Sequence, residues 1–176
     1  MYQIVLILIV AGLTAADQLI KTAVIQQLCP NGHFLLWDGV LEFCYTENYG
    51  IAWGMMQNSR WPVAVLTAVV VVFLLGVLLS GRFKHSRLVS IGGALVIAGG
   101  LGNLLDRVLR GFVVDFIHYY KWFDFPVFNV ADMCITVGAV LILIYFFFFG
   151  SKEAPKEEPH GTPLSDGDST TGGSAD

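Results

Sequence analysis

Residues 88–107 read LVSIGGALVIAGGLGNLLDR, and this stretch decides the fold class. Its part from 88 to 105 is uncharged, and about 20 mostly apolar residues suffice to cross a bilayer as a helix. Small residues recur every four positions at Ala94, Ala98 and Gly102, so another helix can pack closely against that face. The pattern predicts a closely packed transmembrane helix with a polar group at its end.

Three further segments have the same apolar character. The 176-residue chain is 55% hydrophobic, has a mean hydropathy of +0.67 and is 14% charged, whereas a soluble domain has about 25% charged residues. Lipid offers backbone groups no hydrogen-bond partner, so each segment must be helical. We expect an all-α membrane protein in which residues 1–150 form a bundle of four transmembrane helices, at about 4–25, 61–79, 88–105 and 130–149.

The first segment has the position of a secretory signal peptide. Its start, MYQIVLILIV, contains no basic residue, and no clear small-residue cleavage site follows. Because three more spans come after it, we expect a retained helix. Cys29 lies in a poor and distant lipobox, so we do not expect the chain to be a lipoprotein itself.

The net charge of −4 comes from residues 151–176, which contain two lysines and six acids, whereas residues 1–150 contain eight of each sign. This segment is rich in Pro, Gly, Ser and Thr, and we expect a disordered acidic tail. No basic patch indicates nucleic-acid binding. The cysteines and histidines lack metal-ligand spacing, and no nucleotide-binding motif occurs, so we expect neither a metal nor a cofactor.

The distribution of basic residues predicts the orientation in the membrane. Three crowd the eight-residue connection 80–87, whereas one lies in 26–60 and three are spread over 106–130. The excess of Lys and Arg in cytoplasmic loops therefore assigns the 80–87 connection and both termini to the cytoplasm. The opposite ends of the spans then face the extracytoplasmic side.

Unusual polar residues gather at that extracytoplasmic end. With four alternating spans, Asp17, residues 103–107 and residues 129–132 all lie on one side of the membrane. Ionisable groups at membrane depth are costly and usually functional. The candidate site residues are Asp17, Asn48, Asn103, Asp106, Arg107, Asp115, Asn129 and Asp132.

Two of these acids have structural alternatives. Asp115 lies among apolar residues, and its alternative role is a salt bridge to Arg107 or Arg110. Asp132 follows Asn129 by three residues, and its alternative role is a carboxylate that the helix dipole favours at a helix start.

The remaining acids have alternatives of their own. Asp106 and Arg107 are adjacent at a span end, where a structural ion pair is common. Asp17 has the option of extending its carboxylate to water.

Two carboxylates that meet at a membrane face suggest one reaction type. Like charges at close range share a proton, so the ionised partner can take a proton from water while the protonated partner polarises a carbonyl. Such a pair hydrolyses a peptide bond without a metal or a covalent intermediate. Asp115 and Asp132 are 17 positions apart across a loop, and the sequence allows them to meet.

The connections carry patterns of their own. An Asp-Gly turn at 38–39, followed by apolar and polar alternation over 41–46, predicts a small β-element at the membrane surface. Asn-Ser at 58–59 can cap the second span. Residues 112–125 are rich in aromatic side chains, as is typical of an interfacial aromatic belt.

Five short motifs occur in a fixed order along the chain. They are Asp17-Gln18, Asn48-Tyr49-Gly50-Ile51-Ala52-Trp53, GGLGNLLDR (99–107), VVDF (113–116) and FNVAD (128–132). Together they resemble the motifs of bacterial lipoprotein signal peptidase, or signal peptidase II, over about residues 1–150. Ile51 departs from the pattern, where a smaller residue is typical, and this change would alter packing beside the site.

The resemblance implies an aspartyl endopeptidase of the bacterial inner membrane. Such an enzyme removes the signal peptide from prolipoproteins, cutting just before a diacylglyceryl-modified Cys, and is inhibited by globomycin. The resemblance implies that Asp115 and Asp132 form the catalytic pair. It implies supporting or substrate-binding roles for Asp17, Asn48, Gly50, Asn103, Asp106, Arg107, Asn129 and Ala131. It also implies a small extracytoplasmic β-cradle, a surface helix and contact with membrane lipid, and we expect a monomer.

Two other functional classes stay open. A small proton- or ion-coupled transporter could use the same acids, although transporter sites usually lie near the bilayer midplane in interrupted helices. A purely structural membrane subunit would leave Asp115 unexplained. Whether Cys29 and Cys44 form a disulfide is also open.

Overall fold

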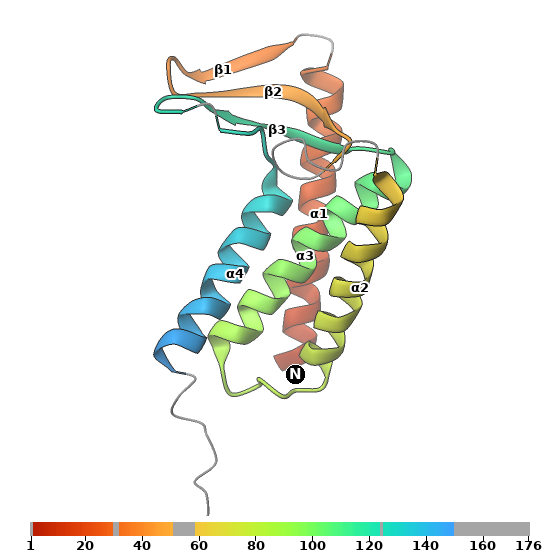
Figure 1. Cartoon of the computed structure of the whole chain (residues 1–176), viewed down its shortest axis with the longest axis vertical. Coiled ribbons are helices and arrows are strands. Elements are labelled where there is room, and N and C mark those ends of the chain that lie inside the picture. The colour runs from red at the N-terminus through yellow and green to blue at the C-terminus, as the bar shows by residue number, and fades with distance from the viewer. Residues whose placement is uncertain (1, 30–31, 51–58, 124, 150–176) are drawn as a thin grey trace, which may run out of the picture.

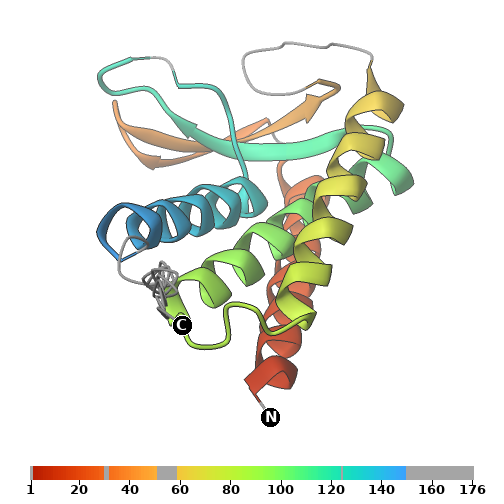
Figure 2. The ribbon, with the colours of Figure 1, turned by 60° about the horizontal axis from the view of Figure 1, so that its bottom comes forward.

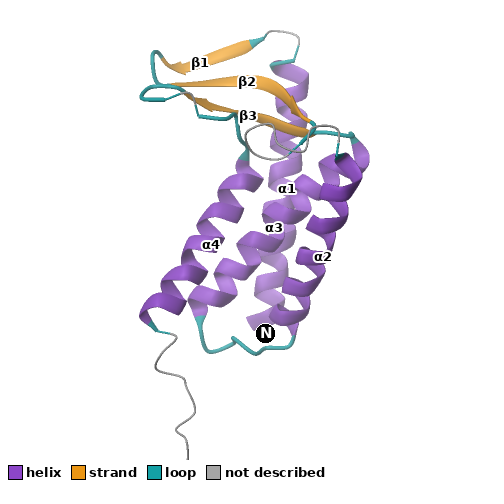
Figure 3. Ribbon diagram, in the orientation of Figure 1, coloured by secondary structure: helices purple, strands orange, loops and turns teal. Residues whose placement is uncertain are grey.

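The computed structural model describes residues 2–29, 32–50, 59–123 and 125–149. Four helices form one bundle, and three strands lie across one end of it (Figure 1; Figure 3 separates helices from strands by colour). The elements are α1 (Tyr2–Gln27), β1 (His33–Trp37), β2 (Leu41–Asn48), α2 (Arg60–Leu79), α3 (Arg87–Leu109), β3 (Val113–Tyr119) and α4 (Val130–Phe148).

All four helices are long and apolar enough to cross a membrane. Their outward faces carry large exposed apolar side chains, such as Val72 on α2 and Phe147 on α4. Apolar surface of this extent is unusual on a soluble monomer, whereas in a bilayer it meets hydrocarbon. The predicted class, a four-helix membrane bundle with a small β-element, is confirmed.

The boundary of α3 differs most from its expected position. The helix continues beyond 105 to Leu109, and the backbone N–H of Arg110 still donates to the carbonyl of Asp106 at 2.8 Å. Gly111 then turns the chain with φ +94°, a left-handed conformation that glycine adopts without strain. The turn leads directly into β3.

The sheet is antiparallel with the order β1-β2-β3. The expected Asp-Gly turn joins β1 to β2, with Gly39 at φ +70°. Residues 113–119, the first part of the aromatic-rich segment 112–125, form a strand that the sequence did not predict. β3 pairs with β2 from Asn48 opposite Val113 to Leu41 opposite Tyr119.

The central helix of the bundle is α3, which packs against each of the other three helices (Figure 2). Small residues bring its backbone against α4. A Cβ atom added to Gly92 would lie 2.7 Å from the carbonyl oxygen of Gly138, and one added to Gly99 would overlap the carbonyl of Ala131. The two helices therefore touch through their backbones at Gly92 and Gly99. The face predicted to pack closely meets α1, since Thr14 and Gln18 donate to the carbonyls of Ala98 and Gly102.

Several expectations concern the connections and termini. Ser59 precedes α2 as expected, but its side chain makes no capping hydrogen bond. Cys29, Cys44 and Cys134 are each unpaired. No surface helix occurs among the described residues, and the expected disordered tail and residues 51–58 lie outside them.

The close approach of α3 and α4 predicts opposite effects for alanine at two adjacent glycines. Gly92→Ala places its Cβ against the Gly138 carbonyl and is expected to destabilise the fold by about 1–3 kcal/mol. Gly93→Ala meets nothing within 4 Å and is expected to be neutral or to stabilise the helix by up to about 1 kcal/mol. Thermal unfolding in detergent checks both; equal midpoints for the two variants would contradict the backbone contact.

Candidate active site

A fully buried lysine lies between the sheet and the helix bundle. Lys21 of α1 is 0% exposed. Its ammonium nitrogen lies 2.9 Å from Asp17 Oδ2 and 2.8 Å from Asp106 Oδ2, and it donates to Asn103 Oδ1 at 3.0 Å. An ammonium group has three N–H donors, and each has a partner here. The charge is thus compensated by two carboxylates and an amide oxygen without contact with water.

The two carboxylates beside Lys21 extend these contacts to the next elements. Asp17 Oδ1 accepts a hydrogen bond from the backbone N–H of Ala131 at the start of α4, at 3.1 Å. Asp106 Oδ2 accepts one from the backbone N–H of Val114 in β3, at 3.2 Å. One buried cluster therefore joins α1 and α3 to the beginnings of α4 and β3.

Asp106 also has two partners on its other oxygen. Arg110, one helical turn later, forms a short ion pair with Asp106 Oδ1, and Gln18 Nε2 donates to the same oxygen at 3.1 Å. Gln18 Oε1 in turn accepts from Arg110 at 2.7 Å. The structural alternative considered from sequence, an ion pair of Asp106 with Arg107, is wrong, because the carboxylate binds Lys21 and Arg110.

Arg107 serves a different purpose. Its guanidinium donates to the carbonyl of Asn103 at 3.2 Å and to the carbonyl of Gly50 at 2.8 Å. The segment that follows β2 is thereby attached to α3. Gly50 uses its own N–H to donate to Asn48 Oδ1 at 3.0 Å, which leaves the NH₂ end of the Asn48 amide facing β3.

Asp115 and Asp132 come together through the amide of Asn129. Asn129 Nδ2 donates to Asp115 Oδ1 at 2.6 Å, and the backbone N–H of Asn129 donates to Asp132 Oδ2 at 3.1 Å. Asn129 Oδ1 accepts from the backbone N–H of Asp132 at 3.0 Å, which completes a capping box at the start of α4. The helix-start role considered for Asp132 is therefore present together with its position beside Asp115.

Two further amides complete the surroundings of the pair. Asn48 Nδ2 donates to Asp115 Oδ2 at 2.9 Å, and Asn103 Nδ2 donates to Asp132 Oδ1 at 2.7 Å. Every oxygen of the two carboxylates thus accepts an N–H donor. Asp115 is 3% exposed and forms no ion pair with Arg107 or Arg110, the alternative considered from sequence.

Lys21 fixes which way the Asn103 amide points. Asn103 Oδ1 accepts from Lys21 and, at 3.2 Å, from Asn129 Nδ2. Since a carbonyl oxygen accepts these bonds, the NH₂ group of Asn103 must face Asp132. The buried cation therefore positions a donor on the Asp115–Asp132 pair without touching either carboxylate itself.

Burial raises the pKa of Asp115 to about 7, and the nearby Asp132 carboxylate adds to the increase. The amide donors of Asn48 and Asn129 act in the opposite direction, because they stabilise the ionised form. A carboxyl group in this state is available as a proton donor near neutral pH.

The structure brings together all ten candidate residues at the sheet end of the bundle. Ala131 contributes its backbone N–H and Gly50 its carbonyl. Asp17 is 2% exposed and bound to Lys21, so the alternative that it reaches water is wrong.

Three residues of the site were not predicted: Gln18, Lys21 and Arg110. The position of Lys21 four residues after Asp17 is the sequence signal for an intrahelical ion pair.

Both the sequence and the fold of this chain resemble those of known proteins. A family model described as "Signal peptidase (SPase) II" matches residues 8–148. The chain is 39% identical to a "Lipoprotein signal peptidase" of Geobacillus thermodenitrificans (strain NG80-2) over 152 residues, which cover 85% of this chain and 94% of that protein. It is also 39% identical to the protein of the same description from Geobacillus kaustophilus (strain HTA426) over 151 residues, covering 85% and 97%.

Two solved structures share the fold, and each is described as a "Bacterial membrane enzyme structure by the in meso method". The one at 2.3 Å resolution has a TM-score of 0.72 at 30% identity and covers 88% of this chain and 94% of that chain. The one at 1.9 Å resolution has a TM-score of 0.73 at 29% identity, covering 82% and 94%.

The Lys21 contacts predict a large loss of stability when only the cation is removed. Lys21→Met leaves the buried Asp17 carboxylate without a cation and Asp106 with Arg110 alone, and is expected to destabilise the fold by about 3–5 kcal/mol. The double variant Lys21→Met, Asp17→Asn also removes the carboxylate charge that lost its cation and is expected to recover part of the loss. Thermal unfolding of both variants in detergent is the measurement; a double variant no more stable than the single one would argue against charge compensation.

Proposed function

This chain belongs to the signal peptidase II family, and we propose that it removes signal peptides from prolipoproteins with Asp115 and Asp132 as its catalytic pair. It is a multi-pass membrane protease of bacterial type. Family membership covers residues 8–148, so we assign the peptidase to residues 1–150 and give the tail no part in it. Membership in this family argues against the two alternatives, a transporter and a purely structural membrane subunit.

The observation that carries the proposed chemistry is that Asn129 binds both carboxylates, Asp115 through its side-chain NH₂ group and Asp132 through its backbone N–H. The contact with Asp132 is part of the capping box at the start of α4. With the pKa of Asp115 at about 7, the pair keeps one proton near neutral pH. The other supporting residues, Asp17, Asn48, Gly50, Asn103, Asp106, Arg107 and Ala131, hold these groups in place rather than react.

The reaction uses that single proton. The ionised carboxylate takes a proton from water as the water oxygen attacks the scissile carbonyl carbon, and the protonated carboxyl gives its proton to the carbonyl oxygen. As the tetrahedral diol collapses, the carboxylate that is now ionised takes a proton from one diol hydroxyl, the C–N bond breaks, and the other carboxyl gives its proton to the leaving nitrogen. Two carboxyl groups thereby complete hydrolysis and return to the one-proton state.

We infer the substrate and the side of the membrane that the site faces from the family to which the chain belongs. We propose that the cut falls just before a diacylglyceryl-modified Cys, with the substrate's acyl chains in lipid and the site on the extracytoplasmic side. Exposed apolar side chains of β1, among them Phe34 and Trp37, support contact between the sheet and the membrane surface. A monomer with both termini in the cytoplasm is part of this proposal, as is inhibition by globomycin.

Removing either charge of the pair is expected to abolish cleavage. Asp132→Asn and Asp115→Asn are nearly isosteric and are expected to lower kcat by at least about a hundredfold, since acid–base groups contribute about 10²–10⁴-fold. The assay is cleavage of a diacylglyceryl-modified prolipoprotein by purified protein in detergent. Asp38→Asn, on the exposed β1–β2 turn, is the matched control and is expected to keep full activity. Undiminished cleavage by a folded Asp132→Asn variant would show that Asp115 and Asp132 are not the catalytic pair.

The pH profile tests the protonation state. Above about pH 7 the pair loses its shared proton, so kcat/KM is expected to fall about tenfold per pH unit. Asn48→Ala removes a donor that stabilises ionised Asp115, so the pKa rises and the alkaline limb moves to higher pH. An alkaline limb that keeps its position in Asn48→Ala would contradict the assignment of this limb to Asp115.

A further inference from the structure

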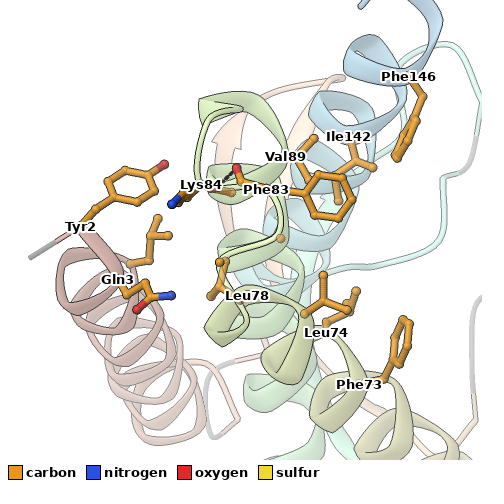
Figure 4. Close-up of a pocket in the computed structure, with 15 residues that line it drawn as sticks. Tyr2, Gln3, Phe73, Leu74, Leu78, Phe83, Lys84, Val89, Ile142 and Phe146 are labelled. Carbon is orange, nitrogen blue, oxygen red and sulfur yellow. Dashed lines mark hydrogen bonds between the residues drawn. The ribbon is translucent and has the colours of Figure 1, made fainter. Parts of the chain in front are cut away.

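A groove lies at the end of the bundle opposite the Asp115–Asp132 pair. It has a cavity of about 260 Å³ and is formed where the start of α1, the end of α2, the start of α3 and the end of α4 meet (Figure 4). Its walls are apolar and include Leu6, Leu74, Leu78, Val89, Ile142 and Phe146. The groove is separate from the catalytic pair and has no part in the proposed hydrolysis.

Two polar side chains in the groove wall are already bound within the protein. Gln3 Nε2 donates to the carbonyl of Leu79 at 2.8 Å, and Ser90 Oγ donates to the carbonyl of Phe83 at 3.0 Å. The interior therefore favours hydrocarbon over water or a polar ligand, because a cavity lined by apolar groups stays dry. Phe73 and Phe146 at its sides are 67% and 53% exposed, so the groove opens onto the apolar surface of the bundle.

The edge of the groove is basic. Lys84 lines it and lies on the Tyr2 side in Figure 4. Within the part of the chain that the structure describes, Lys84 has no ion-pair partner. Arg82 and Arg87 flank Lys84 in the sequence. The acidic residues that the structure describes, Asp17 included, lie towards the sheet end of the molecule, away from this groove. A hydrocarbon slot with a cation at its edge matches a lipid tail attached to an anionic head group.

We propose that this groove binds one acyl chain of an anionic phospholipid, with the phosphate of the head group at Lys84. The apolar walls select the chain, and Lys84 at the edge of the groove selects the charge of the head group. Each basic residue near an anionic lipid surface contributes about 1 kcal/mol, so Lys84 alone should favour an anionic over a zwitterionic lipid by about fivefold.

One glycine offers a way to fill the groove. Gly93 lines it, and a Cβ added there meets nothing within 4 Å, so Gly93→Leu directs its side chain into open space. Gly76 of α2 is exposed, lies outside the lining and also accepts a Cβ freely, which makes Gly76→Leu the matched control. Both changes replace glycine within a helix, so their effects on helix propensity are alike.

The experiment is native mass spectrometry of the full-length protein in detergent, titrated with dioleoyl-phosphatidylglycerol or dioleoyl-phosphatidylcholine. Wild type and Gly76→Leu are expected to retain one phosphatidylglycerol about fivefold more tightly than one phosphatidylcholine. Gly93→Leu is expected to lose at least tenfold in affinity for both lipids. Lys84→Gln, a surface change that leaves the walls intact, is expected to bind both lipids equally.

The outcomes separate the proposal from its rivals. Equal retention of lipid by Gly93→Leu and Gly76→Leu would overturn the groove as the binding place. An unchanged preference for phosphatidylglycerol in Lys84→Gln would overturn the role of Lys84. A complex of two protein chains that the Gly93→Leu change dissociates would assign the groove to a second copy. Prolipoprotein cleavage by all four proteins verifies their folding and tests the proposed peptidase activity separately from lipid binding.

Discussion

A lysine with no exposed surface stays charged inside a protein only if its surroundings replace the water it has lost. Lys21 satisfies this condition with two carboxylates and an amide oxygen, each within 3.0 Å. Desolvating an ammonium group costs several kcal/mol, so all its partners must be in place together. Asp17 also binds the start of α4, and Asp106 binds the start of β3. The contacts of this one cation therefore fix the positions of α1, α3, α4 and β3 relative to one another.

The geometry of the proposed catalytic pair follows from that constraint. Asn103 turns its oxygen to Lys21 and therefore its NH₂ group to Asp132. The NH₂ group of Asn129 donates one hydrogen bond to the same Asn103 oxygen and a second one to the Asp115 carboxylate. The amide orientations are thus set by the hydrogen-bonding rules of the amide group rather than by local packing. This is an instance of preorganisation, in which donors are aimed before substrate arrives.

Hydropathy made the spans predictable, because the requirement for internally bonded backbone in lipid leaves few alternatives. The strand β3 was harder, since Val113-Val114 and the aromatic residues that follow suit an interfacial belt as well as a strand. Its partner β2 is 65 positions away at the pair Asn48–Val113, and no local pattern reports such a distance. The partner of Asp106 was missed for a related reason: ending the third span at 105 leaves no helical turn to bring Arg110 beneath it, whereas the observed helix does.

The ion pairs around Lys21 have a further property, which is that two of them are internal to single helices. Asp17 and Lys21 lie one turn apart in α1, and Asp106 and Arg110 lie one turn apart at the end of α3. Each helix can therefore enter the bilayer during biogenesis with these charges already neutralised by its own neighbour. The ion pair between Asp106 and Lys21, which joins the two helices, then forms only when the inserted helices meet. The same residues that organise the finished enzyme thus also ease the insertion of its separate segments.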